Sequence, residues 1–437
     1  MRVRSTLPPF ARLKSVFRFG PAPQRQVKPY ADNWPEASEF IAQWDEQRAI
    51  ATPPRTGRSK VVLVLPSDPD TLVGSKGDEA MLTACFDHFR AQVPDVEFIV
   101  LVRSELAKRE AVRMGLVPRS VWERGPAMDQ FGEILAGLDA MHVVIVGADI
   151  MDGFYLPSVS AERFAFADLA ARAGLPVTVT GYSFNESPER GLISIVERMD
   201  EAVALNVRDP ISLQRWQLFT AREANLVADV AFLLRPTPAD QIDAELVEWV
   251  AGERQRRRIV FAFNLHDAVL RGVADRREAL YRVGMELRHA AERRAVSWLL
   301  LTHDYRDPAT EAALLEEVHR AADLGRVSRL AGRPYSARDL KGIAGLMDGV
   351  ITGRMHLAVA ALGMGVPVAA FDYQGKFEGL FEHFGLSQRR LGQLPELLED
   401  DGLRAFLKNF LSRRRTERWR IKRRLPAVLE LARRNFD

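Results

Sequence analysis

The chain has 437 residues, of which 47% are hydrophobic and 27% are charged, and its net charge is +3. These proportions are typical of a soluble globular protein and exclude a disordered chain, a collagen-like repeat and a disulfide scaffold, while the length suits two or three domains. The single cysteine, Cys85, cannot form an internal disulfide, so we expect a cytoplasmic protein.

The charge is distributed unevenly along the chain. Residues 1–30 hold seven lysines or arginines and no acid, and residues 401–437 hold twelve against four acids, so the ends carry +7 and +8 and the remainder carries −12. A mildly acidic body between basic ends is not typical of nucleic-acid binding, and we expect no nucleic-acid partner. The basic ends suit peripheral contact with the anionic inner face of the plasma membrane, and equally a solvated helix and tail.

The elements follow a repeating order. Residues 1–57 form an irregular arm rich in proline and arginine, in which one short helix is predicted over 35–48. Residues 58–252 alternate predicted strands (61–65, 98–102, 143–146, 177–180, 202–207) with helices (79–92, 105–114, 161–173, 211–219). Residues 253–390 do the same, with strands at 259–263, 297–301, 349–351 and 367–370 and helices at 276–293, 308–324, 337–347 and 357–362. Residues 391–437 form a basic helical segment.

This alternation predicts an α/β fold made of two Rossmann-like doubly wound domains that face each other across a cleft. No apolar run reaches the roughly 18 residues of a membrane-spanning helix. Ligands of such folds bind beyond the carboxyl ends of the strands, so the residues that follow each strand are the candidates for a site.

Three strand ends of the first domain carry polar candidates. Asp78 and Glu79 open the helix after the first strand, where free backbone N–H groups can meet an anion, although Asp78 could equally cap the helix. Asp149 follows the third predicted strand and either faces the cleft or forms a turn. Arg208 follows the fifth, where a guanidinium is a natural partner for phosphate or carboxylate, unless it is a surface arginine paired with a nearby acid.

The second domain holds the densest polar group. Arg354 and His356 lie in the turn after one strand, and Tyr373 and Lys376 follow the next, so three basic groups at adjacent strand ends would hold a multiply charged anion. His303 follows another strand, where it lines the cleft or serves in a turn. The histidines show no HxxxH or HExxH spacing and the chain has no GxSxG motif, so we expect no metal site and no serine nucleophile elbow.

These motifs resemble the polysaccharide pyruvyl transferase family over roughly residues 59–390. The resemblance is carried by Gly77-Asp78-Glu79, Val207-Arg208-Asp209, Ala228-Asp229-Val230-Ala231-Phe232, and above all Arg354-Met355-His356 followed by Gly365-Val366-Pro367 and Tyr373-x-x-Lys376. It implies a GT-B-like pair of domains, with residues 58–252 on the acceptor side and residues 253–390 on the side of phosphoenolpyruvate (PEP). It also implies transfer of pyruvate from PEP onto two hydroxyls of a sugar, in a bacterial polysaccharide or its lipid-linked precursor, as a cyclic ketal with release of phosphate.

The resemblance places the handling of PEP on Arg208, His356 and Lys376, with Arg354 as the first residue of the Arg-x-His turn. The chemistry agrees, because PEP carries a phosphate and a carboxylate that need several cations, and protonation of its C3 needs an acid such as histidine. PEP is the donor substrate, and no cofactor is expected. A nucleotide-sugar glycosyltransferase and a catalytically silent binding member of a glycan-assembly complex remain alternatives. The sequence leaves open the acceptor sugar, the ketal position, the polymeric or lipid-linked nature of the acceptor, and the oligomeric state.

Overall fold

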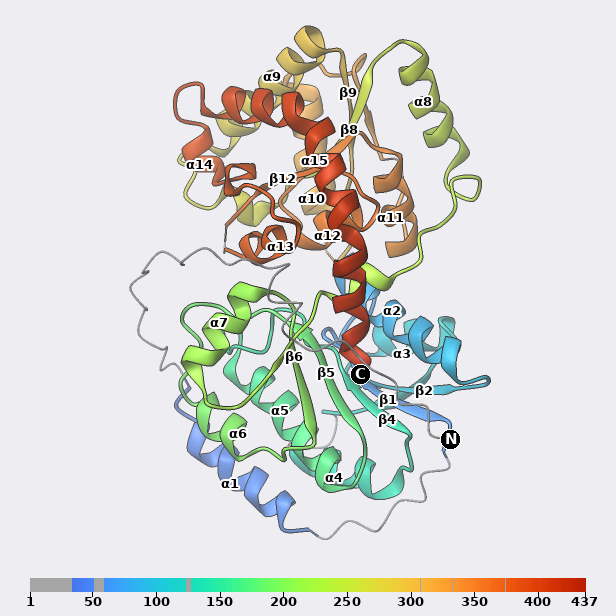
Figure 1. Cartoon of the computed structure of the whole chain (residues 1–437), viewed down its shortest axis with the longest axis vertical. Coiled ribbons are helices and arrows are strands. Elements are labelled where there is room, and N and C mark those ends of the chain that lie inside the picture. Colours follow the sequence, from blue (N-terminus) through green and yellow to red (C-terminus); the bar gives the residue numbers. More distant parts are fainter. Residues whose placement is uncertain (1–33, 51–58, 123–126, 307, 332, 374) are drawn as a thin grey trace, which may run out of the picture.

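The computed structural model describes residues 34–50, 59–122, 127–306, 308–331, 333–373 and 375–437. Within these residues, two parallel sheets with helices on their faces form two domains, one above the other in Figure 1. The first sheet has the order β3-β2-β1-β4-β5-β6-β7, with β1 at Val61–Leu65, β2 at Glu97–Val102, β3 at Val117–Ser120, β4 at His142–Ile145, β5 at Val177–Tyr182, β6 at Val203–Val207 and β7 at Asn225–Leu226. The second has the order β10-β9-β8-β11-β12-β13, with β8 at Ile259–Phe263, β9 at Val296–Leu300, β10 at Ser328–Leu330, β11 at Gly349–Thr352, β12 at Val368–Phe371 and β13 at Leu391–Gly392.

Helices connect the strands in both domains. In the first domain they are α1 (Ala37–Arg48), α2 (Lys76–Gln92), α3 (Glu105–Arg113), α4 (Ala127–Gly137), α5 (Pro157–Arg172), α6 (Leu192–Arg198) and α7 (Pro210–Phe219). In the second they are α8 (Ala244–Gln255), α9 (Arg276–Arg294), α10 (Pro308–Ala321), α11 (Ala337–Leu346), α12 (Met355–Gly363), α13 (Phe377–Phe384), α14 (Leu394–Leu397) and α15 (Gly402–Arg433). The doubly wound fold predicted from the alternation of elements is confirmed.

The central strands were predictable because they are apolar on both faces. In β1, with the sequence VVLVL, four of five residues are buried, as in a parallel strand covered by helices on both sides. The edge strand β3 has the sequence VPRS, with no buried residue, so no hydrophobic run marked it. The edge strands β7, β10 and β13 have only two or three residues, which is too short to show a hydrophobic pattern, and they were not predicted either.

In each sheet the strand order reverses next to the first strand of its domain. β1 pairs with β2 on one side and with β4 on the other, and β8 lies in the same way between β9 and β11. Loops from neighbouring strands diverge at such a point and leave a crevice beyond their carboxyl ends. The two crevices therefore mark where a site between the domains should form.

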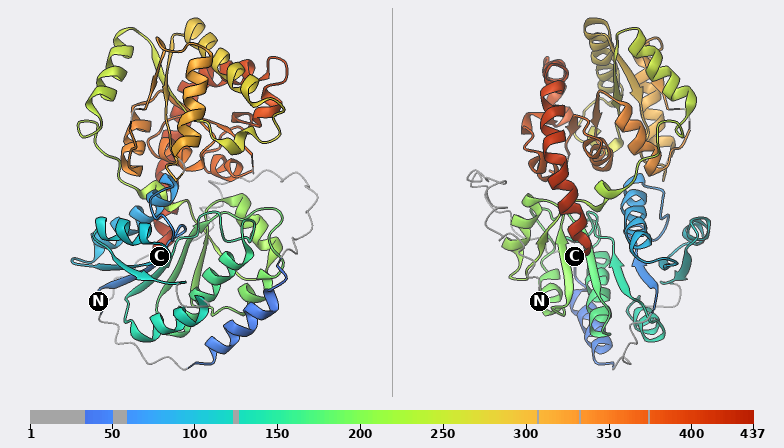
Figure 2. Two further views of the ribbon diagram at one scale, coloured as in Figure 1. Left: turned by 180° about the vertical axis from the view of Figure 1, so that it is seen from behind. Right: turned by 45° about the vertical axis from the view of Figure 1, so that its right-hand side comes forward.

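The C-terminal segment joins the two domains. Figures 1 and 2 show α15 running from the second domain down onto the first, where the chain ends. Asn435 accepts a hydrogen bond from the N–H of Gly181 (2.6 Å) and donates one to the carbonyl of Ala228 (2.9 Å). Phe436 stacks on His88 of α2 with ring centroids 3.8 Å apart. The basic segment is thus helical as predicted, and its buried side packs into the cores of both domains.

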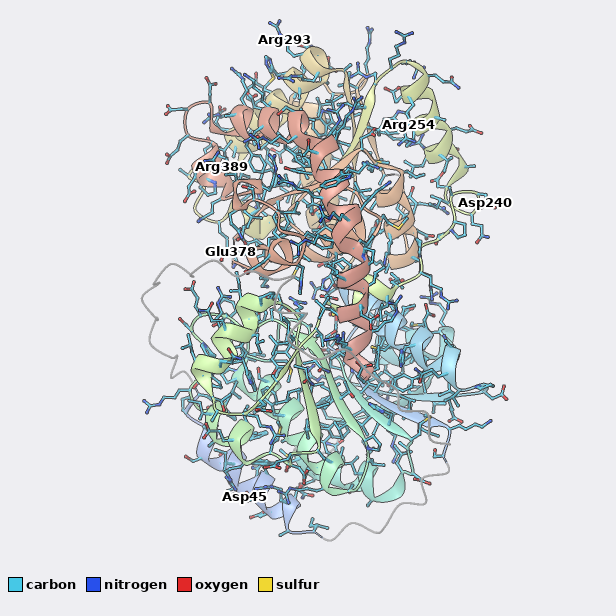
Figure 3. The ribbon with its side chains drawn as sticks, viewed as in Figure 1. Asp45, Asp240, Arg254, Arg293, Glu378 and Arg389 are labelled. Atoms are coloured by element: carbon cyan, nitrogen blue, oxygen red, sulfur yellow. The ribbon has the colours of Figure 1, made fainter. Side chains whose placement is uncertain are left out.

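The N-terminal helix is also part of the first domain. The helix predicted at 35–48 is observed as α1, which packs on α4 and α5 and buries Trp44 completely. The rest of the predicted arm, 1–33 and 51–57, lies outside the described residues. Charged side chains such as Arg254, Arg293 and Arg389 extend from the outer surface of the second domain (Figure 3). No helix in the described parts of the chain is both long and apolar enough to cross a membrane.

Candidate active site

A cavity of about 480 Å³ lies between the domains, and the loops that follow β1, β4, β9, β11 and β12 contribute to its lining. This volume is in the usual range for a site that binds small molecules. Eight of the nine predicted site residues line it: Asp78, Asp149, Arg208, His303, Arg354, His356, Tyr373 and Lys376. Residues that are up to 298 positions apart in the sequence are thus brought together at the crevices of the two sheets.

The ninth residue, Glu79, has a different place. Its carboxylate pairs with Lys76 Nζ (2.7 Å) and accepts a hydrogen bond from the backbone N–H of Ala337 (3.0 Å), in the first turn of α11. Glu79 therefore joins α2 of the first domain to α11 of the second, beside the cavity and outside its lining.

His356 crosses the boundary between the domains. It lies in the first turn of α12, and its Nε2 is 3.3 Å from the Asp229 carboxylate of the first domain. On its other side the ring lies against Gly77 of α2: a Cβ at that position would be 2.7 Å from His356 Cγ and closer still to Nδ1. The glycine of the Gly77-Asp78-Glu79 motif is therefore what allows the imidazole to occupy this place.

Arg208 and Asp229 form a buried ion pair beneath the histidine. The Arg208 guanidinium donates to Asp229 Oδ2 (3.0 Å), to Ser183 Oγ (2.8 Å) and to Met355 Sδ (3.2 Å), and its Nε has no partner among the described residues. Asp229 also caps the 3₁₀ helix Val230–Leu233. Burial opposes ionisation of Asp229, but the positive charges of His356 and Arg208 lower its pKa to about 2.

The opposite end of that short 3₁₀ helix is held by Lys341, which the sequence analysis did not single out. Its Nζ donates to the carbonyls of Phe232 (2.8 Å) and Ala231 (3.3 Å) from α11 of the second domain. Burial lowers the pKa of Lys341 to about 8. The short 3₁₀ helix is thereby fixed at its first end by the side chain of Asp229, in the first domain, and at its other end by Lys341 of the second domain.

Arg354 is held from behind by two carboxylates. Its Nε donates to Glu311 Oε2 (2.9 Å), and its Nη1 lies 3.1 Å from Asp304 Oδ2. Burial raises the pKa of Glu311 although Arg354 opposes the shift, whereas Asp304 has its pKa lowered to about 2 by Arg306 and Arg354 against the effect of burial. This arrangement fixes the plane of the guanidinium at the cavity wall.

Lys376 makes the pair that spans the cavity. Its Nζ contacts the Asp149 carboxylate of the first domain and donates to the hydroxyl of Tyr155 (2.8 Å), and it also lies 5.7 Å from the ring centre of Tyr373. Burial opposes the charge on both partners, yet their attraction raises the pKa of Lys376 and holds that of Asp149 well below its ordinary value. The side chain of Asp149 remains 30% exposed, so this carboxylate faces the cavity.

Two further predicted residues line the cavity. Asp78 accepts a hydrogen bond from Ser67 Oγ (2.5 Å), and burial raises the pKa of Asp78. Burial and the charge of Arg354 hold the pKa of His303 far below its ordinary value, so this imidazole is neutral. The described residues contain no cluster of three or more His, Cys, Asp or Glu that could hold a metal ion.

Several contributors were missed because nothing local marks them. Arg163 is a buried residue of α5 that lines the cavity and donates to the carbonyls of Pro66 and Ser67 (3.2 and 3.0 Å), which fixes the loop after β1. Glu311 belongs to α10, as one acid among several. Both follow helical periodicity rather than a strand end, so only tertiary packing reveals their role.

Four basic side chains that line the cavity, Arg208, Arg354, His356 and Lys376, each lie beside a carboxylate. Asp229 and Glu311 are buried and lie behind Arg208 and Arg354, whereas Asp149 shares the cavity with Lys376. Such a set can bind a small polyanion and supply a proton from His356. Carboxylates and the Tyr155 hydroxyl on the side of the first domain can accept hydrogen bonds from hydroxyl groups.

Comparisons with known proteins agree with this fold. The chain resembles a UDP-N-acetylglucosamine 2-epimerase (13% identity, TM-score 0.55, 88% of this chain and 95% of that one). It also resembles a putative UDP-N-acetylglucosamine 2-epimerase from Listeria monocytogenes (13% identity, TM-score 0.51, 83% of this chain and 90% of that one). A third similar structure is a glycosyltransferase from Rickettsia africae (10% identity, TM-score 0.51, 87% of this chain and 99% of that one). At such low identity the similarity shows the GT-B-like fold alone.

The family follows from the sequence itself. No curated protein matches the chain. The family model described as polysaccharide pyruvyl transferase matches residues 76–375, a span that contains every predicted site residue except Lys376 at its edge. The chain therefore belongs to the polysaccharide pyruvyl transferase family.

Proposed function

We propose that the protein transfers pyruvate from PEP onto two hydroxyls of a sugar and forms a cyclic ketal with release of phosphate. The observation that carries the proposal is the convergence of Arg208, Arg354, His356 and Lys376 on one cavity between the domains. A substrate with both a phosphate and a carboxylate needs several cations at fixed positions, and a guanidinium held by buried carboxylates presents its remaining N–H groups in a defined plane.

Donor binding would exchange one ion pair for another. Asp229 and Glu311 are too deeply buried to leave their arginines, whereas Asp149 is partly exposed and faces the same space as the donor. PEP would therefore take over Lys376 from Asp149. The lysine keeps an anionic partner in both states, so binding does not leave a buried charge unpaired.

His356 is proposed as the acid of the reaction. In the first step the imidazolium protonates C3 of PEP while a sugar hydroxyl adds to C2, and the proton of that hydroxyl passes to the imidazole left neutral, which gives a phosphorylated ketal. In the second step another hydroxyl of the same sugar displaces phosphate from C2 and closes the ring, and the phosphate leaves with the proton of that hydroxyl. Asp229 lies 3.3 Å from His356 Nε2 and would stabilise the protonated imidazole.

A binding experiment separates this function from its alternatives. We expect PEP to stabilise the protein in a thermal-shift titration, by about 2.7 kcal/mol at a hundredfold excess over its Kd, and UDP- or GDP-sugars to have no effect. Stabilisation by a nucleotide sugar and not by PEP would indicate a glycosyltransferase instead, and a response to neither would indicate a silent binding protein.

Substitutions at the basic end test the roles. His356→Ala should reduce phosphate release from PEP by about 10²–10⁴-fold and weaken PEP binding much less. Arg208→Ala should weaken PEP binding, and Arg208→Lys should restore it only in part, because an ammonium cannot make a planar bidentate contact. His289→Ala, on α9 and outside the cavity lining, is the matched control. Unchanged turnover in His356→Ala would remove this histidine from the mechanism.

We also propose peripheral contact with an anionic membrane through α15. Eight of its cations are exposed, and six of them (Lys408, Arg413, Arg415, Arg420, Lys422 and Arg423) lie before and after Trp419, which is 61% exposed. Basic residues next to an interfacial tryptophan suit an anionic lipid surface. Phe436, the aromatic residue near the end of the chain, stacks on His88 within the protein and is therefore not part of this proposed membrane contact. Co-sedimentation with phosphatidylglycerol vesicles should exceed that with phosphatidylcholine and fall with salt and in Trp419→Ala; equal pelleting with both lipids would exclude the contact.

A further inference from the structure

Three consecutive large apolar side chains are exposed at the edge of the cavity. Phe154, Tyr155 and Leu156 are 56%, 50% and 60% exposed, and they precede α5 in the loop after β4. Tyr155 and Leu156 line the cavity itself. Single exposed apolar residues are ordinary on a protein surface, but three adjacent ones at the mouth of a site mark a binding surface.

The backbone that carries them is fixed. The buried Asp152 accepts hydrogen bonds from the N–H groups of Phe154 and Asn185, both at 3.0 Å. Gly153 adopts φ 77°, a conformation that favours glycine, and its N–H donates to Ser160 Oγ (2.9 Å). The backbone of this loop is therefore ordered before any ligand binds, which lowers the entropy lost on binding.

Polar groups lie directly beside this apolar surface. The hydroxyl of Tyr155 donates to Asp149 Oδ2 (3.1 Å) and accepts from Lys376 Nζ (2.8 Å). An aromatic surface bordered by a carboxylate and a hydroxyl matches a pyranose, which has an apolar C–H face and a rim of hydroxyl groups. An acyl chain on the same surface would remove Asp149 from water without offering it a hydrogen bond.

We propose that Phe154, Tyr155 and Leu156 bind the acceptor: a neutral sugar ring packs on these side chains and directs its hydroxyls to Asp149. This inference rests on the proposed function and names the acceptor class of the same site. When PEP takes Lys376, Asp149 and the Tyr155 hydroxyl each lose the lysine as a donor, and both oxygens can then accept a hydrogen bond from the sugar. The acceptor therefore binds better after the donor than before it.

The test uses the full chain, PEP, and a panel of p-nitrophenyl hexopyranosides of gluco, galacto and manno configuration. Binding of each sugar is measured by saturation-transfer NMR with and without PEP, and PEP binding by thermal shift. The variants are Phe154→Ala, Tyr155→Ala and Tyr155→Phe, which keeps the ring. Tyr281→Ala on α9 is the matched control, because Tyr281 is 43% exposed and lies outside the cavity lining.

We expect at least one hexopyranoside to bind the parent protein, more tightly with PEP. Phe154→Ala and Tyr155→Ala should weaken this binding by about tenfold through lost apolar contact, while PEP binding by Phe154→Ala and every ligand response of Tyr281→Ala stay at the parent level. Tyr155→Phe should keep most of the sugar affinity.

Each other outcome is decisive. Sugar binding that is unchanged in both alanine variants would overturn the proposal, and so would a parent protein that binds PEP but none of the sugars. Binding of polyprenyl phosphate that competes at this loop, without any binding of the sugars, would reassign the surface to the lipid part of the acceptor and overturn the proposal too. A parent that does not bind PEP would instead refute the proposed function, so the two failures are distinguishable.

Discussion

Gly77→Ala should disable the site through a single methyl group. Gly77 lies in the first turn of α2, where alanine is otherwise the better helix former by up to about 1 kcal/mol. The added Cβ would be 2.7 Å from His356 Cγ and closer still to Nδ1, whereas ordinary Cβ contacts begin near 3.4 Å. Because backbone lies on one side of the contact, the imidazole is the group that must move, by about 1 Å.

The size of the effect follows from that displacement. A shift of about 1 Å in a catalytic group costs on the order of 10²-fold in rate, so we expect turnover of Gly77→Ala to fall by about that factor. PEP binding should fall less, because Arg208, Arg354 and Lys376 remain in place. Overpacking costs about 1–3 kcal/mol of unfolding free energy, which exceeds the gain in helix propensity.

A double-mutant cycle with His356→Ala isolates the contact. In the His356→Ala background the space is empty, so Gly77→Ala should be neutral or stabilising, and the coupling energy should be about 1–3 kcal/mol. Gly252→Ala in α8 is the control, since its nearest neighbour would be 3.8 Å from the new Cβ. Unfolding in urea and phosphate release from PEP are the two measurements. Parent turnover together with a raised Tm in Gly77→Ala would refute the placement of the imidazole against α2.

Three further outcomes follow from buried charges. Asp229→Asn leaves the Arg208 guanidinium without its counter-charge and should lower the unfolding free energy in urea by about 3–5 kcal/mol; a loss below about 1 kcal/mol would contradict a buried pair. Lys341→Met leaves two carbonyls without donors and should cost about 1–3 kcal/mol, and parent stability would disprove the role of Lys341. Burial raises the pKa of Asp152 from 3.8 to about 6, so the native state holds this proton more tightly than the unfolded chain does. The parent protein therefore loses roughly 3 kcal/mol of unfolding free energy as pH rises through this window, and Asp152→Asn does not. Urea unfolding of both proteins from pH 4 to pH 7 should show the stability difference changing by about that amount in favour of Asp152→Asn. A stability difference that does not change with pH would contradict the raised pKa.

The sequence predicted the central architecture because parallel strands and their helices have distinct periods. β1 and β8 are apolar throughout and β4 is apolar after His142, and amphipathic helices alternate with the strands, so their order alone implied two doubly wound sheets. Short edge strands carry no such period. Helices α4, α6, α8 and α13 were also not predicted, and in α8 the apolar residues form only a weak stripe that packing completes.

The site was predictable to the extent that it is built from strand ends. Asp149, Arg208 and Lys376 follow strands, and the topology brings these positions to one cavity. Two carboxylates that hold the arginines were given no role from the sequence: Glu311 lies within a helix, and Asp229 was noted only as part of a family motif, before a 3₁₀ turn. Sequence spacing shows which residues reach the crevice. It does not show which of them are paired.

Pairing across the domain boundary links catalysis to domain orientation. His356 belongs to the second domain and its carboxylate partner Asp229 to the first, and Lys376 and Asp149 are divided in the same way. Outside the cavity, Nη2 of Arg338 donates to both carboxylate oxygens of Asp87 (2.6 Å each). If the domains separated, these pairs would open together and the histidine would lose its counter-charge. Under the proposed function, a donor that replaced Asp149 at Lys376 would leave the Asp229–His356 and Arg338–Asp87 contacts intact, and the two domains would stay joined while the acceptor binds.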